Sequence, residues 1–436
     1  MKRNTVRKSL TFIEALAIVV GMIIGSGIFL KPGIVLNNAG SPLMSLAAWI
    51  VGGIITLASA LSVAEIAAAI PKSGGLYIYL EELYGETIGF LLGWVQAIIS
   101  YPASVAAQAI AFATYASVFI PLDGTEQKLL ALGVLSFILI MNVLSTRYGG
   151  VIQTIATVGK LIPIVAIIAL GLISKTTGDF SAMATAGRSL GFGAAILGTL
   201  WAYDGWIGVT NMAGELKNPA KNLPKVIAIG VVFVIAVYAT FNIAIFKVLP
   251  VEVIASSNTP GADAAVALLG KGGATFITAG IMVSVFGALN GYLMTAARVP
   301  MVMGEKNRLP YGKVIGKLHS KYQTPANALI LQSVLAVIYI LSGSFNTLTD
   351  LLIFVLWIFF TMGVFGVFIL RKKQGTKPGL YKVPLYPITP LVGIIGGGYI
   401  LVSTVISAPV NSLIGIAITL AGLPLFYYLK SKDKVK

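Results

Sequence analysis

The feature that most constrains this chain is a series of long apolar runs that recur along nearly its whole length. A helix needs about 20 residues to cross the hydrocarbon layer of a membrane, and most of these runs are that long. A transmembrane β-barrel would instead show short segments in which apolar and polar residues alternate. We therefore expect an all-α membrane protein with twelve transmembrane helices. The runs lie at about residues 11–37, 42–68, 87–120, 127–146, 149–174, 190–213, 224–249, 264–304, 326–343, 348–371, 387–407 and 410–429.

Composition agrees with a membrane protein and excludes several kinds of site. Hydrophobic residues make up 57% of the chain and charged residues 11%, against about half and about a quarter in a soluble domain. The chain has no cysteine, which excludes disulfides and thiol metal sites. The single histidine, His319, lies in a basic loop with no carboxylate or cysteine at ligand spacing. We expect neither a metal nor a cofactor.

The net charge of +16 is explained by membrane topology. If all twelve runs cross the bilayer, 23 of the 31 Lys and Arg residues lie on the side of the N-terminus and 6 lie on the other side. Cationic residues collect in cytoplasmic loops, so we expect a multi-pass protein of the cell membrane with both termini in the cytoplasm. Nucleic acid, the usual partner of a basic soluble protein, is not expected. The basic N-terminus precedes an apolar run too long for a signal peptide, which predicts a retained first span.

Two of the apolar runs are interrupted near their middle. The first contains Gly25-Ser26-Gly27, and the sixth contains Asp204 and Gly205. Glycine costs about 1 kcal/mol in a helix interior, and a carboxylate at bilayer depth costs about 2.5 kcal/mol or more. Irregular backbone at this depth is tolerated only where it lines a cavity or is buried in protein. We therefore expect the first and sixth helices to be unwound at mid-span.

Interruptions in the first and sixth spans predict a repeating unit of five helices. Five is odd, so the second unit enters the membrane from the opposite face and forms an inverted repeat. On this basis residues 1–174 form the first repeat, 175–372 the second, and 373–436 two extra helices with a basic C-terminus. A protein of the major facilitator type would place equivalent features in the first and seventh spans.

The two interruptions offer opposite charges to one small molecule. The N–H groups of Gly25-Ser26-Gly27 begin a half-helix, where the helix dipole favours an anion such as a carboxylate. The break between Trp201 and Gly205 leaves unpaired carbonyls at the end of another half-helix, which favour an ammonium group. An α-amino acid carries both groups. The alternative for Gly25-Ser26-Gly27 is close helix packing through small residues.

Four motifs resemble the amino acid-polyamine-organocation superfamily, and within it the L-amino-acid transporter branch with its bacterial serine/threonine and alanine/serine/cysteine exchangers. The resemblance covers nearly the whole chain, and the order and spacing of the motifs make it specific. It implies a five-plus-five, LeuT-like fold and sodium-independent exchange of small neutral L-amino acids such as alanine, serine and threonine. The motifs are Gly25–Phe29, Pro71–Tyr79, Trp201–Trp206, and Gly214–Pro219 with Leu223–Lys225.

The resemblance also assigns the substrate contacts. It implies that Gly25, Ser26 and Gly27 bind the substrate carboxylate, and that backbone carbonyls of Trp201-Ala202-Tyr203 bind its amino group. Trp201 matches an aromatic gate over the substrate, the alternative being a lipid-facing ring. Many relatives have a small residue at the position of Asp204. Its role is open between local pairing, a hydrogen bond to the unwound backbone, and direct contact with the substrate.

Lys160 lies more than ten residues from either end of the fifth run, which is about 16 Å or more of helix. Its side chain is too short to reach water over this distance, so we expect it to bind carbonyls of an unwound helix. The resemblance implies that it replaces the sodium ion that sodium-coupled members bind between their first and eighth helices. It is then either a fixed strut in an obligatory exchanger or a proton carrier in a proton-coupled symporter. A charge paired only for packing is the third alternative.

Other polar residues have more local assignments. We expect Arg298 to form a structural ion pair, with Glu215 as the candidate partner and a cytoplasmic gate latch as the result. Tyr238 either lines the transport pathway or packs in the core. Glu65 and Glu81-Glu82 are expected to be solvated at the cytoplasmic boundary.

These features favour a transporter over an enzyme or a channel. An enzyme would need a nucleophile, a base or a metal in the membrane, and the chain has no HExxH motif and only one histidine. A channel would need a ring of selectivity groups.

Few acidic residues reach mid-span, which favours neutral substrates. Animal relatives pair with a single-span glycoprotein through a disulfide, which a chain without cysteine cannot form. Oligomeric state and the pocket residues of helices 3, 8 and 10 stay open.

Overall fold

The computed structural model describes residues 9–117, 119–176, 178–180, 191–257, 259–342, 345–374, 379–407 and 409–434. Some of the cations counted in the predicted topology lie outside the described residues. They are the four among residues 1–8, Arg188, Lys377 and Lys436. The rest of the charge pattern falls on described segments.

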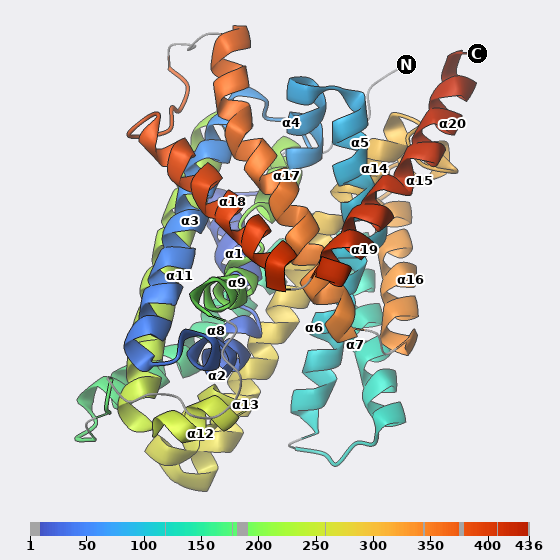
Figure 1. The fold of residues 1–436 in the computed structure, drawn as a ribbon. Coiled ribbons are helices and arrows are strands. Elements are labelled where there is room, and N and C mark those ends of the chain that lie inside the picture. The colour runs from blue at the N-terminus through green and yellow to red at the C-terminus, as the bar shows by residue number, and fades with distance from the viewer. Residues whose placement is uncertain are drawn as a thin grey trace.

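The described chain is helical throughout, apart from short connections and one isolated bridge, and the predicted all-α class is confirmed (Figure 1). Its first part forms α1 (Phe12–Ile23), α2 (Gly27–Ala39), α3 (Pro42–Ala69), α4 (Gly75–Tyr84), α5 (Glu86–Trp94), the π-helix η1 (Val95–Ser100), α6 (Tyr101–Ala116), α7 (Gly124–Leu144) and α8 (Thr146–Ile173). Its second part forms α9 (Phe192–Tyr203), α10 (Gly208–Asn211), the 3₁₀ helix η2 (Ala213–Glu215), α11 (Pro219–Val248), α12 (Val251–Ser256), α13 (Pro260–Ala296), α14 (Arg298–Glu305), α15 (Gly312–Ile315), α16 (Ala326–Ser342), α17 (Phe345–Gln374), α18 (Ile388–Ser407), α19 (Pro409–Leu420) and α20 (Gly422–Lys434).

Within the described residues, ten helical segments are long and apolar enough to cross a membrane. Two further apolar helices, α9 and α16, are shorter than these ten segments. The chain is therefore a multi-pass membrane protein. The count of twelve spans, the inverted repeat and the division at residues 174 and 372 stay predictions.

Two apolar helices end and restart where the sequence places its interruptions. α1 ends at Ile23 and α2 begins at Gly27, so the backbone leaves helical geometry between them. α9 ends at Tyr203, and the turn that follows leads to α10 at Gly208. The interrupted helices lie inside the bundle, with α3 and α11 on one side and α6, α7 and α16 on the other (Figure 1). Helices α1, α8, α11 and α13 pack against one another around the first break.

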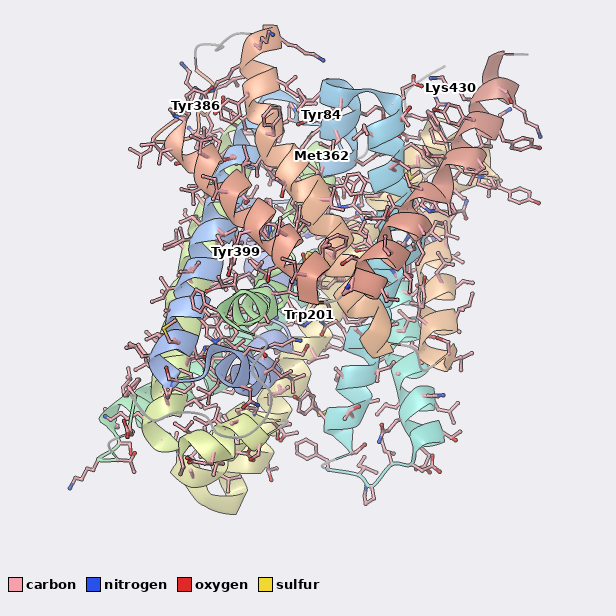
Figure 2. The ribbon with its side chains drawn as sticks, in the orientation of Figure 1. Tyr84, Trp201, Met362, Tyr386, Tyr399 and Lys430 are labelled. Atoms are coloured by element: carbon pink, nitrogen blue, oxygen red, sulfur yellow. The ribbon has the colours of Figure 1, made fainter. Side chains whose placement is uncertain are left out.

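Both ends of the described chain lie at the same end of the bundle, drawn at the top of Figure 1. α4 and the end of α17 lie there too. The hydroxyl of Tyr84 on α4 donates to the carbonyl of Met362 on α17 at 2.7 Å, which ties these two helices together (Figure 2).

Glu65 corrects an expectation, because it is buried rather than solvated. Its carboxylate accepts from Arg371 Nε and Nη2, each at 2.8 Å, and from the backbone N–H of Val383 at 2.6 Å. The guanidinium of Arg371 also lies 3.7 Å from the centre of the Tyr386 ring. Glu65 thus holds α3 to α17 and to the segment that leads into α18. A carboxylate with three donors is stable without water, which explains its burial.

Glu81 and Glu82 lie in ion pairs near the same end of the bundle. Glu81 pairs with Lys306 at 2.6 Å, and Glu82 pairs with Lys72. The Lys72 side chain is 62% exposed, so this second pair is a surface pair.

Replacing Glu65 is expected to destabilise the fold. In Glu65→Gln the guanidinium of Arg371 loses its counter-charge, and breaking a fully buried pair costs about 3 to 5 kcal/mol. Because Arg371 is 17% exposed, we expect a smaller loss of about 2 kcal/mol in the free energy of unfolding. Thermal unfolding in detergent measures it as a lower midpoint. Glu82→Gln is the matched control and should change the free energy by less than about 0.5 kcal/mol. Equal midpoints for the two variants would contradict the assignment.

Candidate functional site

Lys160 on α8 binds the carbonyls that the first break leaves free. Its Nζ donates to the carbonyl of Gly21 at 2.7 Å and to that of Ile24 at 2.5 Å, and its side chain is fully buried. The hydroxyl of Ser284 on α13 lies 3.2 Å from the Ile24 carbonyl oxygen and 3.3 Å from that of Gly25. The break is therefore held by donors from two neighbouring helices. The acceptors of Lys160 are thus carbonyls of the interrupted helix, and its role as a substitute for sodium or as a proton carrier stays a prediction.

One face of α8 positions Lys160 against α1. Thr157 and Gln153 lie on the same face and both donate to the carbonyl of Ala17, at 3.0 and 3.3 Å. Residues three, four and seven apart share one side of a helix, so these three side chains point the same way. A Cβ at Gly21 would lie only 2.0 Å from the amide nitrogen of Gln153. The glycine allows α8 to approach α1 closely enough for Lys160 to reach the break.

The start of α2 presents N–H groups without acceptors. The N–H of Gly25 donates to the carbonyl of Ile23 at 2.9 Å, but those of Ser26, Gly27 and Ile28 have no acceptor within the described part of the chain. Helix N-termini leave such donors free, and their partial positive charge favours an anion.

Gln108 on α6 is a site residue that the sequence analysis missed. Its side-chain amide lies next to Gly25, at 3.4 Å from where a Cβ would be, and it is 6% exposed. Its Oε1 has no hydrogen-bond partner among the residues described. A glutamine in the middle of an apolar helix is the signal that would have indicated it.

The second break lies directly against the first. A Cβ at Gly27 would lie 2.7 Å from the Cα of Ala202, and a Cβ at Gly205 would lie 2.9 Å from the Cβ of Met22. Gly205 also has a φ of 105°, which side chains rarely allow. Glycine at both positions therefore permits the contact between the breaks.

Tyr238 on α11 bridges the two breaks. Its hydroxyl lies 2.9 Å from the carbonyl oxygen of Ile23 and 2.8 Å from that of Ala202, so it can donate to either one. It is fully buried and packs against the rings of Tyr203 and Trp49, with centroids 5.0 and 5.3 Å away. Tyr238 is therefore a core residue placed between the breaks.

Trp201 and Tyr203 lie on different sides of the end of α9. The hydroxyl of Tyr203 donates to the carbonyl of Trp49 at 3.1 Å, which directs its ring toward α3. Trp201 is half-buried (Figure 2). The ammonium of Lys31 lies 5.8 Å from the centre of its ring. Its role as a gate stays a prediction.

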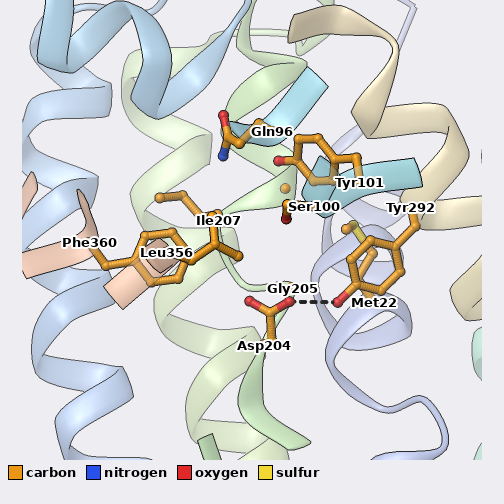
Figure 3. A pocket seen from close by; sticks show the side chains of 11 residues that line it. Met22, Gln96, Ser100, Tyr101, Asp204, Gly205, Ile207, Tyr292, Leu356 and Phe360 are labelled. Atoms are coloured by element: carbon orange, nitrogen blue, oxygen red, sulfur yellow. Dashed lines mark hydrogen bonds between the residues drawn. The ribbon is translucent and has the colours of Figure 1, made fainter. Parts of the chain in front are cut away.

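A narrow cavity lies beside the second break (Figure 3). Its polar lining comes from Gln96, Ser100, Tyr101, Asp204 and Tyr292, and its apolar lining comes from Met22, Ile207, Leu356 and Phe360, with Gly205 and Gly208. Of the residues that the sequence analysis connects with the substrate, Asp204 lines this cavity. Gly25, Ser26, Gly27, Trp201, Ala202 and Tyr203 do not.

The cavity is lined by hydrogen-bond acceptors and donors. The carboxylate of Asp204 accepts from the hydroxyl of Tyr292 at 2.9 Å and retains further lone pairs. Across the cavity, Gln96 is 2% exposed and its Oε1 has no partner within the described structure. Gln96 and Ser100 belong to the π-helix η1, whose extra residue turns their side chains inward, and such bulges are frequent at functional sites. Asp204 can accept from a small group in the cavity, and the hydroxyls of Ser100 and Tyr101 can donate to one.

Arg298 and Glu215 form a buried ion pair, as the sequence analysis suggests. Arg298 Nε and Nη2 donate to the two carboxylate oxygens at 2.6 and 2.9 Å, and both side chains are almost fully buried. Next to this pair, the N–H of Leu10 donates to the carbonyl of Glu215 at 3.0 Å and the N–H of Lys217 donates to that of Leu10 at 3.1 Å. The segment before α1 is thus joined to the segment after α10.

His319 contributes to its own loop. Its Nδ1 accepts from the backbone N–H groups of Lys321 and Tyr322, both at 3.2 Å. No group of three or more potential metal ligands occurs in the part of the chain that the structure describes.

Comparison with known proteins gives matches over nearly the whole chain. Residues 10–426 match a family model described as amino acid permease. The chain is 41% identical to the serine/threonine exchanger SteT of Bacillus subtilis, over 98% of each chain. It is 33% identical to the b(0,+)-type amino acid transporter 1 of Mus musculus, over 98% of this chain and 89% of the relative. It is 32% identical to the large neutral amino acids transporter small subunit 2 of Homo sapiens, over 98% and 82%.

The contact between the breaks predicts that Gly27→Ala destabilises the protein. The new methyl group would overlap the backbone of Ala202, so α9 must move, and such overpacking costs about 1 to 3 kcal/mol. Thermal unfolding of the purified protein should show a lower midpoint. Gly398→Ala on α18 is the control, because no heavy atom lies within 4 Å of its new methyl group. An unchanged midpoint for Gly27→Ala would show that the breaks tolerate separation.

Proposed function

Because the chain belongs to the amino acid permease family, we propose that it exchanges small neutral L-amino acids across the cell membrane by alternating access, without sodium. Its relatives are named as transporters and exchangers of amino acids. The basic residues at the end of the bundle that holds both chain ends support a cytoplasmic position for the termini.

The observation that carries the proposal is the close approach of the two breaks. The free N–H groups of Ser26, Gly27 and Ile28 suit a carboxylate. Beside them, the carbonyls of Trp201 and Ala202 accept from the N–H of Asp204 and from Tyr238, and each keeps a second lone pair for an ammonium group. These groups lie on either side of the contact between Gly27 and Ala202. A zwitterion can bind both the N–H groups and the carbonyls. The rest of the pocket then contacts its side chain.

Lys160 supports independence from sodium. A fixed ammonium already occupies the carbonyls of Gly21 and Ile24, which are the ligands that a hard cation such as sodium would use. A second cation at the same carbonyls would meet like charge in a buried place, where repulsion is strong. In this proposal Lys160 is a strut that stays in place through the exchange cycle.

The cavity beside Asp204 supports small side chains that donate a hydrogen bond. Asp204 supplies acceptors, while Leu356 and Phe360 limit the space beside it. Serine and threonine carry a hydroxyl of this kind. The cavity has a volume of about 10 Å³, the room of one water molecule, so a side chain enters it only when the surrounding helices move apart. A relative of this chain is named as a serine/threonine exchanger. In this proposal Asp204 contacts the substrate side chain.

The contacts at the two ends of the pathway support alternating access. The pair of Arg298 with Glu215 closes the end where the chain begins and ends, and the contact of α2 with α9 closes the other. We assign the pair as the cytoplasmic latch. A carrier of this kind opens one of these closures at a time.

Exchange in proteoliposomes tests the proposed function. Vesicles loaded with unlabelled serine should take up labelled serine several times faster than empty vesicles, because an obligatory exchanger returns across the membrane only with cargo. Replacing external sodium by choline should leave the rate unchanged.

Two outcomes of the same assay would contradict the proposal. Uptake into empty vesicles under an inward proton gradient would establish the alternative, a proton-coupled symporter with Lys160 as the proton carrier. Stronger competition by arginine or glutamate than by alanine, serine or threonine would overturn the substrate class.

Replacing Lys160 by methionine is expected to lower exchange at least about tenfold. Lys160→Met keeps a similar length but leaves the carbonyls of Gly21 and Ile24 without their donor, and an unsatisfied buried acceptor costs about 1 to 3 kcal/mol. Initial exchange rates measure the loss. Lys225→Met is the control, because Lys225 is exposed on α11. Full activity in Lys160→Met would exclude the strut.

A further inference from the structure

An open groove lies between α20 and residues 307–314, which include the connection after α14 and the start of α15. It is separate from the breaks, and it lies at the end of the bundle that holds both chain ends (Figure 1). The exchange function uses none of its residues.

One face of α20 lines the groove while another face holds the helix in place. Phe426 packs against Phe90 with ring centroids 4.9 Å apart, and Lys430 pairs with Glu86 at 2.9 Å. These contacts fix the rotation of α20. Another face of α20 is turned toward the groove. Its residues lie three, four and seven positions apart, so they form one stripe along the helix. They are Leu425, Tyr428, Leu429 and Lys432.

This stripe changes from apolar to cationic along the helix. Leu425 and Lys432 are separated by seven residues, which is about 10 Å of helix, and Tyr428 and Leu429 lie between them. The layers of a membrane boundary have the same order, from the hydrocarbon that suits leucine, through the interface that suits tyrosine, to the headgroups that suit lysine. The helix also belongs to the last apolar segment that is able to cross a membrane, and it ends at the edge of that segment.

The opposite wall has the same character. Val314 and Tyr311 are 56% and 85% exposed, and Lys313 lies between them in the sequence. Lys313 and Lys432 are the charged residues of the groove lining, which holds no carboxylate among the residues described. A charged partner of this groove is therefore an anion, and it must carry an apolar part to cover the leucines.

We propose that the groove binds one anionic phospholipid. Its phosphodiester lies between the ammonium groups of Lys313 and Lys432, and its acyl chain covers Leu425, Leu429 and Val314. The hydroxyls of Tyr311 and Tyr428 sit at interfacial depth, where aromatic residues of membrane proteins collect. Basic pockets between helices on the cytoplasmic side are the kind of site that holds anionic headgroups.

The lipid would strengthen a junction that already exists. Glu86 on α5 is shared by Lys430 of α20 at 2.9 Å and by Arg308 of the opposite wall at 3.1 Å. A lipid between the walls joins α20 to the same segment on its open side.

Native mass spectrometry of the full-length protein tests this site with phosphatidylglycerol and with phosphatidylcholine of the same acyl chains. The wild type should retain phosphatidylglycerol in preference to phosphatidylcholine. The double variant Lys313→Gln/Lys432→Gln should bind phosphatidylglycerol roughly 25-fold more weakly, because each of the two cations near an anionic headgroup contributes roughly a factor of five. Lys217→Gln/Lys225→Gln removes the same charge from exposed positions outside the groove and should bind as the wild type does.

Several outcomes would overturn the proposal. These are equal binding of the two lipids by the wild type, unchanged binding by the groove variant, and an equal loss in the control variant. Displacement of the lipid by glycerol phosphate at similar concentration would assign the site to a soluble phosphate compound. A dimer that the groove variant dissociates would assign it to a second copy of the chain. The unfolding midpoint of each variant establishes that the protein is folded.

Discussion

The contact between the Lys160 ammonium and the carbonyls of Gly21 and Ile24 is the interaction on which the rest of the site depends. A broken helix inside a membrane leaves carbonyls with no water to satisfy them, and a lone ammonium there has the opposite need. Each makes the other stable. Asp204 in the second break accepts from the hydroxyl of Tyr292. The first break therefore binds a basic side chain, and the second contributes an acidic one.

The close contact of the breaks follows from small residues at a few positions. Gly21 lets α8 approach α1, Gly27 lets α2 meet Ala202, and Gly205 fits against Met22. At Gly27 and Gly205 a methyl group would overlap the backbone or Cβ of Ala202 and Met22, whereas at Gly21 it would meet the side-chain ends of Gln153 and Thr157. The same glycines weaken their helices, so one residue type both opens the backbone and allows the parts to pack.

Much of this arrangement follows from the sequence, because depth and spacing alone indicate that Gly25-Ser26-Gly27 and Asp204-Gly205 interrupt helices and that Lys160 needs acceptors. Side-chain partners far along the chain do not follow. Glu65 binds Arg371 and Val383, 306 and 318 residues away, and nothing local marks it as buried. The inward direction of Gln96 depends on a π-helix that apolar periodicity does not reveal. The orientation of Trp201 depends equally on packing between distant helices.

The position of Tyr238 affects the hydrogen bonding at the contact between the two breaks. Its hydroxyl has two carbonyl oxygens within reach, those of Ile23 and Ala202, and a single hydrogen to give. Whichever oxygen receives it, the other is left without this donor. The Ile23 oxygen also accepts from the N–H of Gly25, so it keeps a donor when the Tyr238 hydroxyl turns to Ala202. Rotation about a single C–O bond therefore decides whether the Ala202 oxygen has this donor.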